Sequence, residues 1–226
     1  MATTTFDRHQ PAAKSRDVNE RDDRRSSERQ SQFALPRGLV GHAAGWIMAV
    51  KNRPMNRLAV ELLDPDPADR ILEIGIGAGA ALQMLARRAG PGRIAGVDPS
   101  ATMLKQARWR NRRAVAAGVV ELRQADAARL PFDDGSFAKV FAVNSFHLWP
   151  APLAGLAEAR RVLTPGGMLL LALRMSLAKP TCFSAPGLTE AQVQHAAQLA
   201  QHAGFQDVRL LRRRAGRQTT CLLAWC

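Results

Sequence analysis

Tyrosine is absent from this 226-residue chain, and aromatic residues make up only 5% of it. Its three cysteines, Cys182, Cys221 and Cys226, are an odd number without metal-ligand spacing, which argues against a disulfide framework and a zinc site. The longest apolar run, Met168–Leu173, is far shorter than the about 20 residues of a membrane-spanning helix. The N-terminus has no apolar segment of the secretory type. We therefore expect a cytoplasmic protein with no membrane span and no metal.

Acidic residues are also scarce, since 32 Lys and Arg face 19 Asp and Glu, for a net charge of +13. A basic balance can indicate nucleic acid or another acidic surface as partner. The arginine clusters around Arg108–Arg113 and at Arg212–Arg214 lack the interleaved aromatic residues that stack bases, because Trp109 stands alone. The clusters therefore favour solvated faces and argue against a nucleic-acid partner.

The organisation of the chain changes near residue 36. Asp17–Arg29 alternates arginine with acidic residues and offers little to a core, so residues 1–36 are predicted to be a disordered charged tail. Residues 37–226 form one domain, which begins with a helical cover at about 39–63 that Asn52–Pro54 divides into two helices.

Strands and helices then alternate along the chain. Strands are expected at Arg70–Ile74, Arg93–Val97, Val119–Arg123, Ala138–Val143, Met168–Leu173, Val208–Arg213 and Thr219–Ala224. Helices are expected at Ala80–Arg88, Ser100–Ala117, Leu153–Leu163 and Glu190–His202. Thr164–Gly167 is predicted to be a turn. This order predicts an α/β fold with a doubly wound, Rossmann-like sheet of seven strands, mostly parallel, in which a C-terminal hairpin contributes one antiparallel strand.

A glycine-rich loop follows the first of these strands. Gly75, Gly77 and Gly79 allow a tight turn and the close approach of a ligand to the backbone. Asp98, 19 residues after Gly79, ends the second strand, where a carboxylate can accept hydrogen bonds from ribose hydroxyls. With Ala80, the loop also fits the dinucleotide pattern G-x-G-x-x-A, so a dinucleotide-dependent oxidoreductase remains an alternative at this point.

Three further segments accompany the loop: Gln124–Phe137 with its Asp-Ala pair, Asn144–Trp149 after the fourth strand, and Ala157–Gly167. Together with Glu73 and the glycines, they resemble the class I S-adenosylmethionine-dependent methyltransferases over Leu39–Cys226. The resemblance is strongest to the type 11 subgroup, which methylates small molecules, quinone precursors among them. It implies S-adenosylmethionine as cofactor and S-adenosylhomocysteine as product.

The resemblance also implies a cofactor site made of Glu73, Gly75, Ile76, Gly77, Gly79, Asp98, Met103, Asp126, Ala127 and Asn144. In such proteins the loop passes the methionine part of the cofactor, and the residue at Asp98 binds the ribose. The residue at Met103 packs on adenine, while Asp126 and the amide of Ala127 meet the adenine edge. Asn144 would border the methionine end and the acceptor.

Transfer of a methyl group from a sulfonium requires mainly the alignment of donor and nucleophile. His147 is the candidate general base, because it follows Asn144 and an imidazole titrates near neutrality; a role in packing or in orienting the acceptor is the alternative. Trp46, Arg53, Phe146 and Trp149 are candidates for the acceptor site, with core packing or solvation as the alternative for each.

The sequence therefore predicts a methyltransferase that acts on a small molecule by in-line displacement. An RNA methyltransferase that uses the basic surface, or a cofactor-binding partner protein without activity, are the alternatives. The Pro-Pro-Tyr or Pro-Pro-Phe signature of enzymes that methylate adenine or glutamine nitrogen is replaced by Asn144–His147. The acceptor, its reacting atom and the oligomeric state stay open at this point.

Overall fold

The computed structural model describes residues 52–88, 93–176 and 187–226. The predicted tail, the first part of the predicted helical cover and Trp46 lie outside these ranges.

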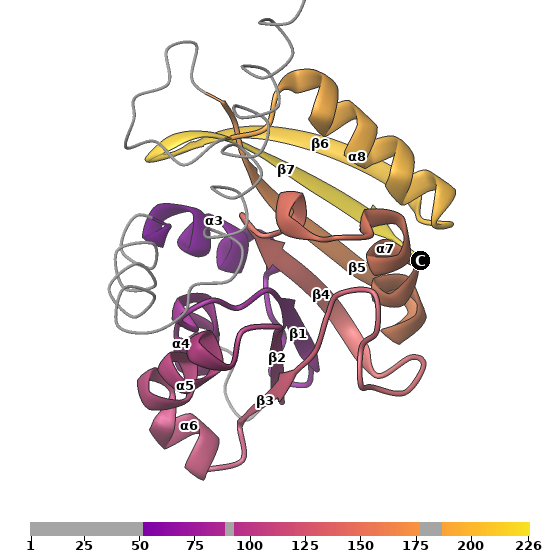
Figure 1. The fold of residues 1–226 in the computed structure, drawn as a ribbon. Helices are drawn as coiled ribbons and strands as arrows, with labels where there is room; N and C mark the ends of the chain where they lie inside the picture. Colours follow the sequence, from indigo (N-terminus) through magenta and orange to yellow (C-terminus); the bar gives the residue numbers. More distant parts are fainter. Residues whose placement is uncertain (1–51, 89–92, 177–186) are drawn as a thin grey trace, which may run out of the picture. The chain divides into compact units, whose positions relative to one another are not determined.

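Seven strands form one sheet in the order β3-β2-β1-β4-β5-β7-β6 (Figure 1). They are β1 (Ile71–Ile74), β2 (Ile94–Asp98), β3 (Val120–Gln124), β4 (Phe137–Val143), β5 (Leu163–Arg174), β6 (Gln206–Ala215) and β7 (Arg217–Trp225). The pairs from β3 to β5 are parallel, whereas β7 runs antiparallel to both β5 and β6. The predicted fold class, with one antiparallel strand from the C-terminal hairpin, is confirmed.

Helices cover both faces of the sheet (Figure 1). They are α3 (Arg53–Leu63), α4 (Ala80–Arg88), α5 (Ala101–Arg110), α6 (Arg112–Ala116), the 3-10 helix η1 (Phe146–Leu148), α7 (Pro152–Val162) and α8 (Glu190–His202). One apolar core joins the sheet to α3, α4 and α5, and the other joins it to α7 and α8. In the described ranges, no helix is both long and apolar enough to cross a membrane.

Two elements differ from the prediction. The expected helix Ser100–Ala117 is divided at Asn111, whose side-chain amide donates to the carbonyl oxygens of Ala107 (2.9 Å) and Gly79 (3.0 Å). The fifth strand begins at Leu163, because the predicted turn Thr164–Gly167 is accommodated as an irregularity within β5. The hydrogen bond from Asn111 to Gly79 and the pairing of β5 with β4 are tertiary contacts that local sequence patterns do not reveal.

The carboxyl ends of β1, β2, β3, β4 and β5 meet at one edge of the sheet because these strands are parallel. Ligands of open α/β sheets bind at this edge. The strand order places the loops after β1, β2 and β3 on one side of β4, and the end of β5 on its other side. The predicted site residues in the described ranges follow the ends of β1, β2, β3 and β4, apart from Arg53 at the start of α3, Glu73 within β1 and Asp98 as the last residue of β2.

Candidate functional site

The loop after β1 is closed on one side and open on the other. Gly75, Gly77 and Gly79 all have positive φ angles, of 77°, 50° and 71°. A Cβ atom at Gly79 would lie 2.7 Å from the side-chain amide nitrogen of Asn111 and 2.8 Å from the Cβ of Ala107. The absence of a side chain at Gly79 therefore allows the loop to pack closely against α5. At Gly77 a Cβ atom would meet nothing within 4 Å. The loop therefore leaves open space beside its middle glycine.

Asp98 fixes the loop from the end of β2. Its Oδ2 accepts from the backbone N–H of Gly77 (2.9 Å), and its Oδ1 accepts from that of Ser100 (2.9 Å). Ser100 in turn caps α5 by accepting from the N–H of Met103, whose side chain is buried. Asp98 is 6% exposed, and desolvation raises its pKa although the two N–H donors lower it. Each carboxylate oxygen can accept a further hydrogen bond, as a ribose would require.

Glu73 lies buried on β1 beneath the same loop. Its pKa is well above the ordinary 4.5, first because of burial and then because of the negative charge of Asp98; a backbone N–H from Leu82 opposes this shift. Its Oε2 has no hydrogen-bond partner among the described residues. No ion pair in the described ranges involves Glu73 or Asp98. Two neighbouring carboxyls without a cation favour a positively charged ligand.

The Asp126-Ala127 pair follows β3. Asp126 is half-buried, and its Oδ1 accepts from the N–H of Ala128 (2.9 Å), which forms a tight Asx turn. In the described part of the chain its Oδ2 has no hydrogen-bond partner. Ala127 is buried in the core on the side of α7. This turn leaves one carboxylate oxygen available at the edge of the sheet.

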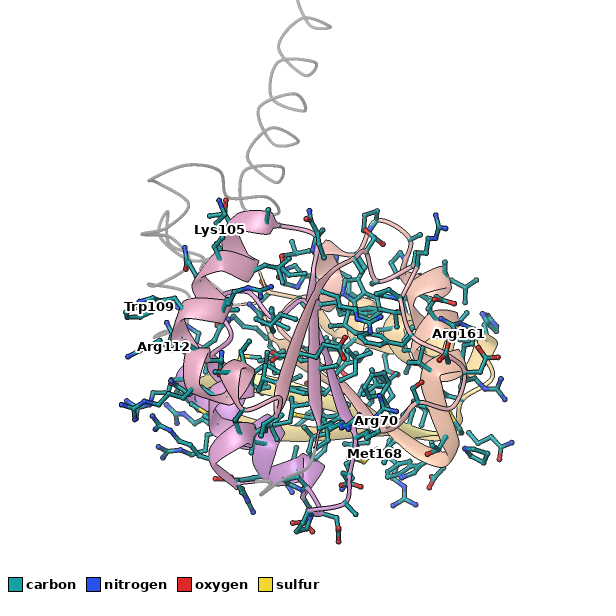
Figure 2. The ribbon with its side chains drawn as sticks, turned by 90° about the horizontal axis from the view of Figure 1, so that it is seen from below. Arg70, Lys105, Trp109, Arg112, Arg161 and Met168 are labelled. Carbon is teal, nitrogen blue, oxygen red and sulfur yellow. The ribbon has the colours of Figure 1, made fainter. Side chains whose placement is uncertain are left out.

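A pair of charged residues on α7 holds the next part of this loop. Glu158 accepts from the N–H of Leu130 (2.8 Å) and pairs with Arg161 (2.6 Å). Arg161 also pairs with Asp134 (2.7 Å), and these carboxylates raise its pKa; Figure 2 shows it on the opposite side of the molecule from Trp109. This network explains why charged residues recur in the Ala157–Gly167 segment: they position the loop after β3.

The end of β4 has an unusual backbone. Asn144 has a positive φ of 52°, and its Oδ1 is buried without a hydrogen-bond partner among the described residues. Such strain is characteristic of functional positions. The next residue, Ser145, donates to the carbonyl oxygen of Ile74 (2.8 Å), and its Cβ lies 2.6 Å from where a Cβ of Gly75 would be. The ends of β1 and β4 are therefore joined directly.

Phe146 and Trp149 belong to the core rather than to an open wall. Both are buried, and their rings meet edge to face with centroids 5.1 Å apart. Trp149 also covers Gly155, where a Cβ atom would lie 2.6 Å from the indole ring. Its Nε1 is buried without a partner in the described ranges. The structure thus supports the packing alternative for both rings, with one indole N–H left to donate.

His147 stands between these two rings in the sequence but is exposed. Desolvation by the surrounding protein lowers its pKa below the ordinary 6.5, and the positive charge of Arg174 lowers it further. The imidazole is therefore neutral at pH 7 and able to accept a proton.

Arg174, which our sequence analysis did not single out, ends β5 and is near enough for its charge to act on His147. It is 7% exposed, and its Nη2 donates to the side-chain oxygen of Asn52, just before α3. Arg53, the arginine that the sequence suggested for the acceptor, is exposed instead. One sequence feature indicates Arg174 as a candidate: it is a charged residue directly after the apolar run Met168–Leu173.

A cavity of about 390 Å³ lies elsewhere in the described part of the chain. Arg70, Arg93 and Val119 line it, and they directly precede β1, β2 and β3. It therefore opens at the edge opposite the predicted site, and none of the predicted site residues lines it.

The chain is similar to known methyltransferases in sequence and in fold. Residues 72–171 match a family model described as a methyltransferase domain. The uncharacterized methyltransferase YdaC of Bacillus subtilis is 30% identical over 165 residues, 73% of this chain and 87% of that protein. A demethylmenaquinone methyltransferase of Thermus thermophilus is 38% identical over 116 residues, and these cover 51% of each chain. A solved SAM-dependent methyltransferase from Aquifex aeolicus is 20% identical and superposes with a TM-score of 0.63 over 75% of this chain and 88% of that one.

Proposed function

Because the chain belongs to the class I S-adenosylmethionine-dependent methyltransferases, with S-adenosylmethionine as its cofactor, we propose that it methylates a small-molecule acceptor by in-line displacement. When bound, S-adenosylmethionine supplies a methyl group activated by a positively charged sulfur. The observation that carries the proposal is the carboxyl edge, where the open glycine loop is held by Asp98 and contacts Ser145, the residue directly after Asn144.

The residues present fit this cofactor. The open space at Gly77 admits a ligand to the backbone, and Asp98 has oxygens free to accept from ribose hydroxyls. The uncompensated carboxyls of Glu73 and Asp98 suit a ligand with a sulfonium and an ammonium group. The free Oδ2 of Asp126 and the buried Met103 suit an adenine edge and face.

The chain itself contributes in two ways: it aligns the acceptor with the methyl donor, and it accepts a proton from the acceptor. The link between Ser145 and Ile74 holds the ends of β1 and β4 in register, which fixes the acceptor side relative to the cofactor side. His147, whose pKa is lowered by partial desolvation and by the charge of Arg174, would remove a proton from an acceptor hydroxyl or amine. No other catalytic side chain is needed, because the leaving group requires no protonation.

The relatives support a small acceptor. The Thermus thermophilus relative is named for demethylmenaquinone. Because the chain spans about half of that relative's length, we take only the size class of the acceptor from it.

Calorimetry with S-adenosylhomocysteine, followed by assay of its formation from S-adenosylmethionine across a panel of small phenols, amines and carboxylates, tests the proposal. We expect stoichiometric binding and acceptor-dependent turnover that Asp98→Asn weakens. Absence of binding would refute the cofactor assignment for this site. Binding without turnover on any acceptor would favour the non-catalytic partner protein.

A second candidate, an RNA methyltransferase, rests on one exposed surface. Trp109 on α5 is 67% exposed, the guanidinium of Arg112 lies 5.4 Å from its ring centroid, and Lys105 lies on the same side (Figure 2). Stacking on a base would use such a ring. Retention on heparin with a steep salt dependence that Trp109→Ala reduces would support RNA, whereas weak retention would exclude it.

A further inference from the structure

A buried positive charge lies at the acceptor side of the edge. The carboxyl end of β5 pairs with the start of β7, in the register Arg174 to Thr219. Arg217, two residues earlier on β7, is close enough for its charge to act on Arg174, and Arg174 in turn acts on His147. Three groups from distant parts of the sequence thus form one region, which we call the basic cluster: His147, Arg174 and Arg217.

Among the residues that the structure describes, no carboxylate forms an ion pair with Arg174 or Arg217 of this cluster. The one side-chain partner of Arg174 in the described ranges is the neutral amide of Asn52. Residues 29–60 and 175–189, which flank Asn52 and follow Arg174 in the sequence, contain no Asp or Glu. A guanidinium removed from water without a counterion is costly.

Strand order places the cluster on the acceptor side. The loop after β1 and the Asp98 carboxylate lie on one side of β4, whereas Arg174 lies beyond it on β5. Neighbouring strands are about 4.8 Å apart, so β5 lies about 10 Å from β1. His147 follows β4, the strand between β1 and β5, and the charge of Arg174 lowers its pKa.

We propose that Arg174 binds an anionic oxygen group of the acceptor, a carboxylate or a phosphate, and so presents the acceptor's nucleophile to His147. The proposal rests on the methyltransferase function proposed above and adds the chemical class of its acceptor. A guanidinium binds two oxygens of either group in a planar, bidentate manner, which explains an arginine at this position. Asn52 is a positioning residue, because it holds the guanidinium through one N–H, and no other described side chain accepts from Arg174.

Matched probes test the proposal on the full chain saturated with S-adenosylhomocysteine. Calorimetry compares benzoate with benzamide, octanoate with octanamide, indole-3-acetate with its amide, and phenyl phosphate with phenol. We expect the anion of at least one pair to bind about tenfold or more tightly than its neutral partner. The phosphate pair distinguishes a phosphorylated acceptor from a carboxylate. A chain that binds S-adenosylhomocysteine but prefers no anion refutes this inference and leaves the proposed function standing.

Two variants sharpen the measurement. Arg174→Met removes the charge and should abolish the preference for the anion. Asn52→Asp places a carboxylate against the guanidinium in an almost unchanged shape, and it should abolish the preference while the protein stays folded. Arg112→Met, an exposed arginine on α6, is the matched control that should keep the preference. Retained preference in both test variants would overturn the proposal.

S-adenosylhomocysteine carries a carboxylate of its own, so the test must also distinguish an Arg174 that binds the acceptor from one that binds the cofactor. If Arg174 serves the acceptor, Arg174→Met binds S-adenosylhomocysteine as the native protein does. Weaker binding of S-adenosylhomocysteine together with an unchanged probe preference would assign Arg174 to the cofactor and overturn the proposal. Proton NMR adds a readout without any acceptor: both Arg174→Met and a bound anion should raise the pKa of His147.

Discussion

The two sides of the carboxyl edge, which we propose as the cofactor side and the acceptor side, differ in charge and in the way the chain builds them. The cofactor side, at the ends of β1, β2 and β3, is acidic, with Glu73, Asp98 and Asp126. The acceptor side, beyond β4, is basic, with Arg174 and Arg217 next to His147. In the described ranges no ion pair neutralises Asp98 or Asp126 on the first side, or Arg174 or Arg217 on the second. A site divided in this way suits a cationic methyl donor on one side and an anionic acceptor on the other.

The difference also concerns geometry. The cofactor side is held by backbone groups, since Asp98 is bound by the N–H groups of Gly77 and Ser100 and the loop is pressed onto α5. The acceptor side is held by side chains from separate elements, such as Asn52 and Arg174. We therefore expect changes on the cofactor side to alter stability and cofactor affinity, and changes on the acceptor side to alter turnover.

The largest expected effect is on turnover. His147→Ala should lower kcat by about 10²-fold or more if His147 is the general base, while the affinity for S-adenosylhomocysteine stays the same. Because the pKa of His147 lies below 6.5, the native rate should fall only as the pH drops through that lower value and the imidazole becomes protonated. Arg174→Met should move this fall toward higher pH. An unchanged rate in His147→Ala, measured as S-adenosylhomocysteine release, would remove the base role.

The next effect compares two glycines of one loop. Gly79→Ala should lower the free energy of unfolding by about 2–5 kcal/mol, because it combines a left-handed backbone with contacts to Asn111 and Ala107. Gly77→Ala should cost only about 1–2 kcal/mol, since only its φ is unfavourable. Urea unfolding gives both values. Equal losses would mean that the loop is not pressed onto α5 as described.

A smaller change is expected at the ribose position. Asp98→Asn should weaken S-adenosylhomocysteine binding by about 1.5–3 kcal/mol, the scale of charge-assisted hydrogen bonds. Asp133→Asn, an exposed carboxylate in the loop after β3, is the matched control. Calorimetry on folded variants measures both, and unchanged affinity in Asp98→Asn would contradict the ribose assignment.

The smallest effect tests the buried acid beneath the loop. The folded protein raises the pKa of Glu73, so it keeps a proton that the unfolded chain releases above about 4.5. The contribution of Glu73 to stability therefore falls as the pH rises from 4.5 through the raised pKa. Glu73→Gln should stabilise the free protein by about 1 kcal/mol at pH 7 and by less near pH 4. The control Glu61→Gln, at an exposed position, should leave the stability unchanged at both pH values. Thermal unfolding at the two pH values checks this, and a destabilised Glu73→Gln at pH 7 would contradict it.

Local patterns in the sequence determined the strands, the helices and the cofactor side. The glycine loop and Asp98 are read from neighbouring residues, because backbone turns and strand ends depend on local chemistry, whereas the role of the Asp-Ala pair came from the family resemblance. The division of the helix at Asn111 was missed, since it depends on a hydrogen bond to Gly79, which lies 32 residues away in the chain.

The acceptor side was decided by the tertiary structure. Arg174 meets Asn52 across 122 positions of sequence, and no short pattern records that encounter. The sequence alone suggested Arg53 and the rings of Phe146 and Trp149, but the fold exposes the arginine and buries the rings. The packing of β5, β7 and α3 decides which charge becomes buried without a partner. The physical reason is that electrostatic energy depends on the distance between charges in space and not on their separation along the chain.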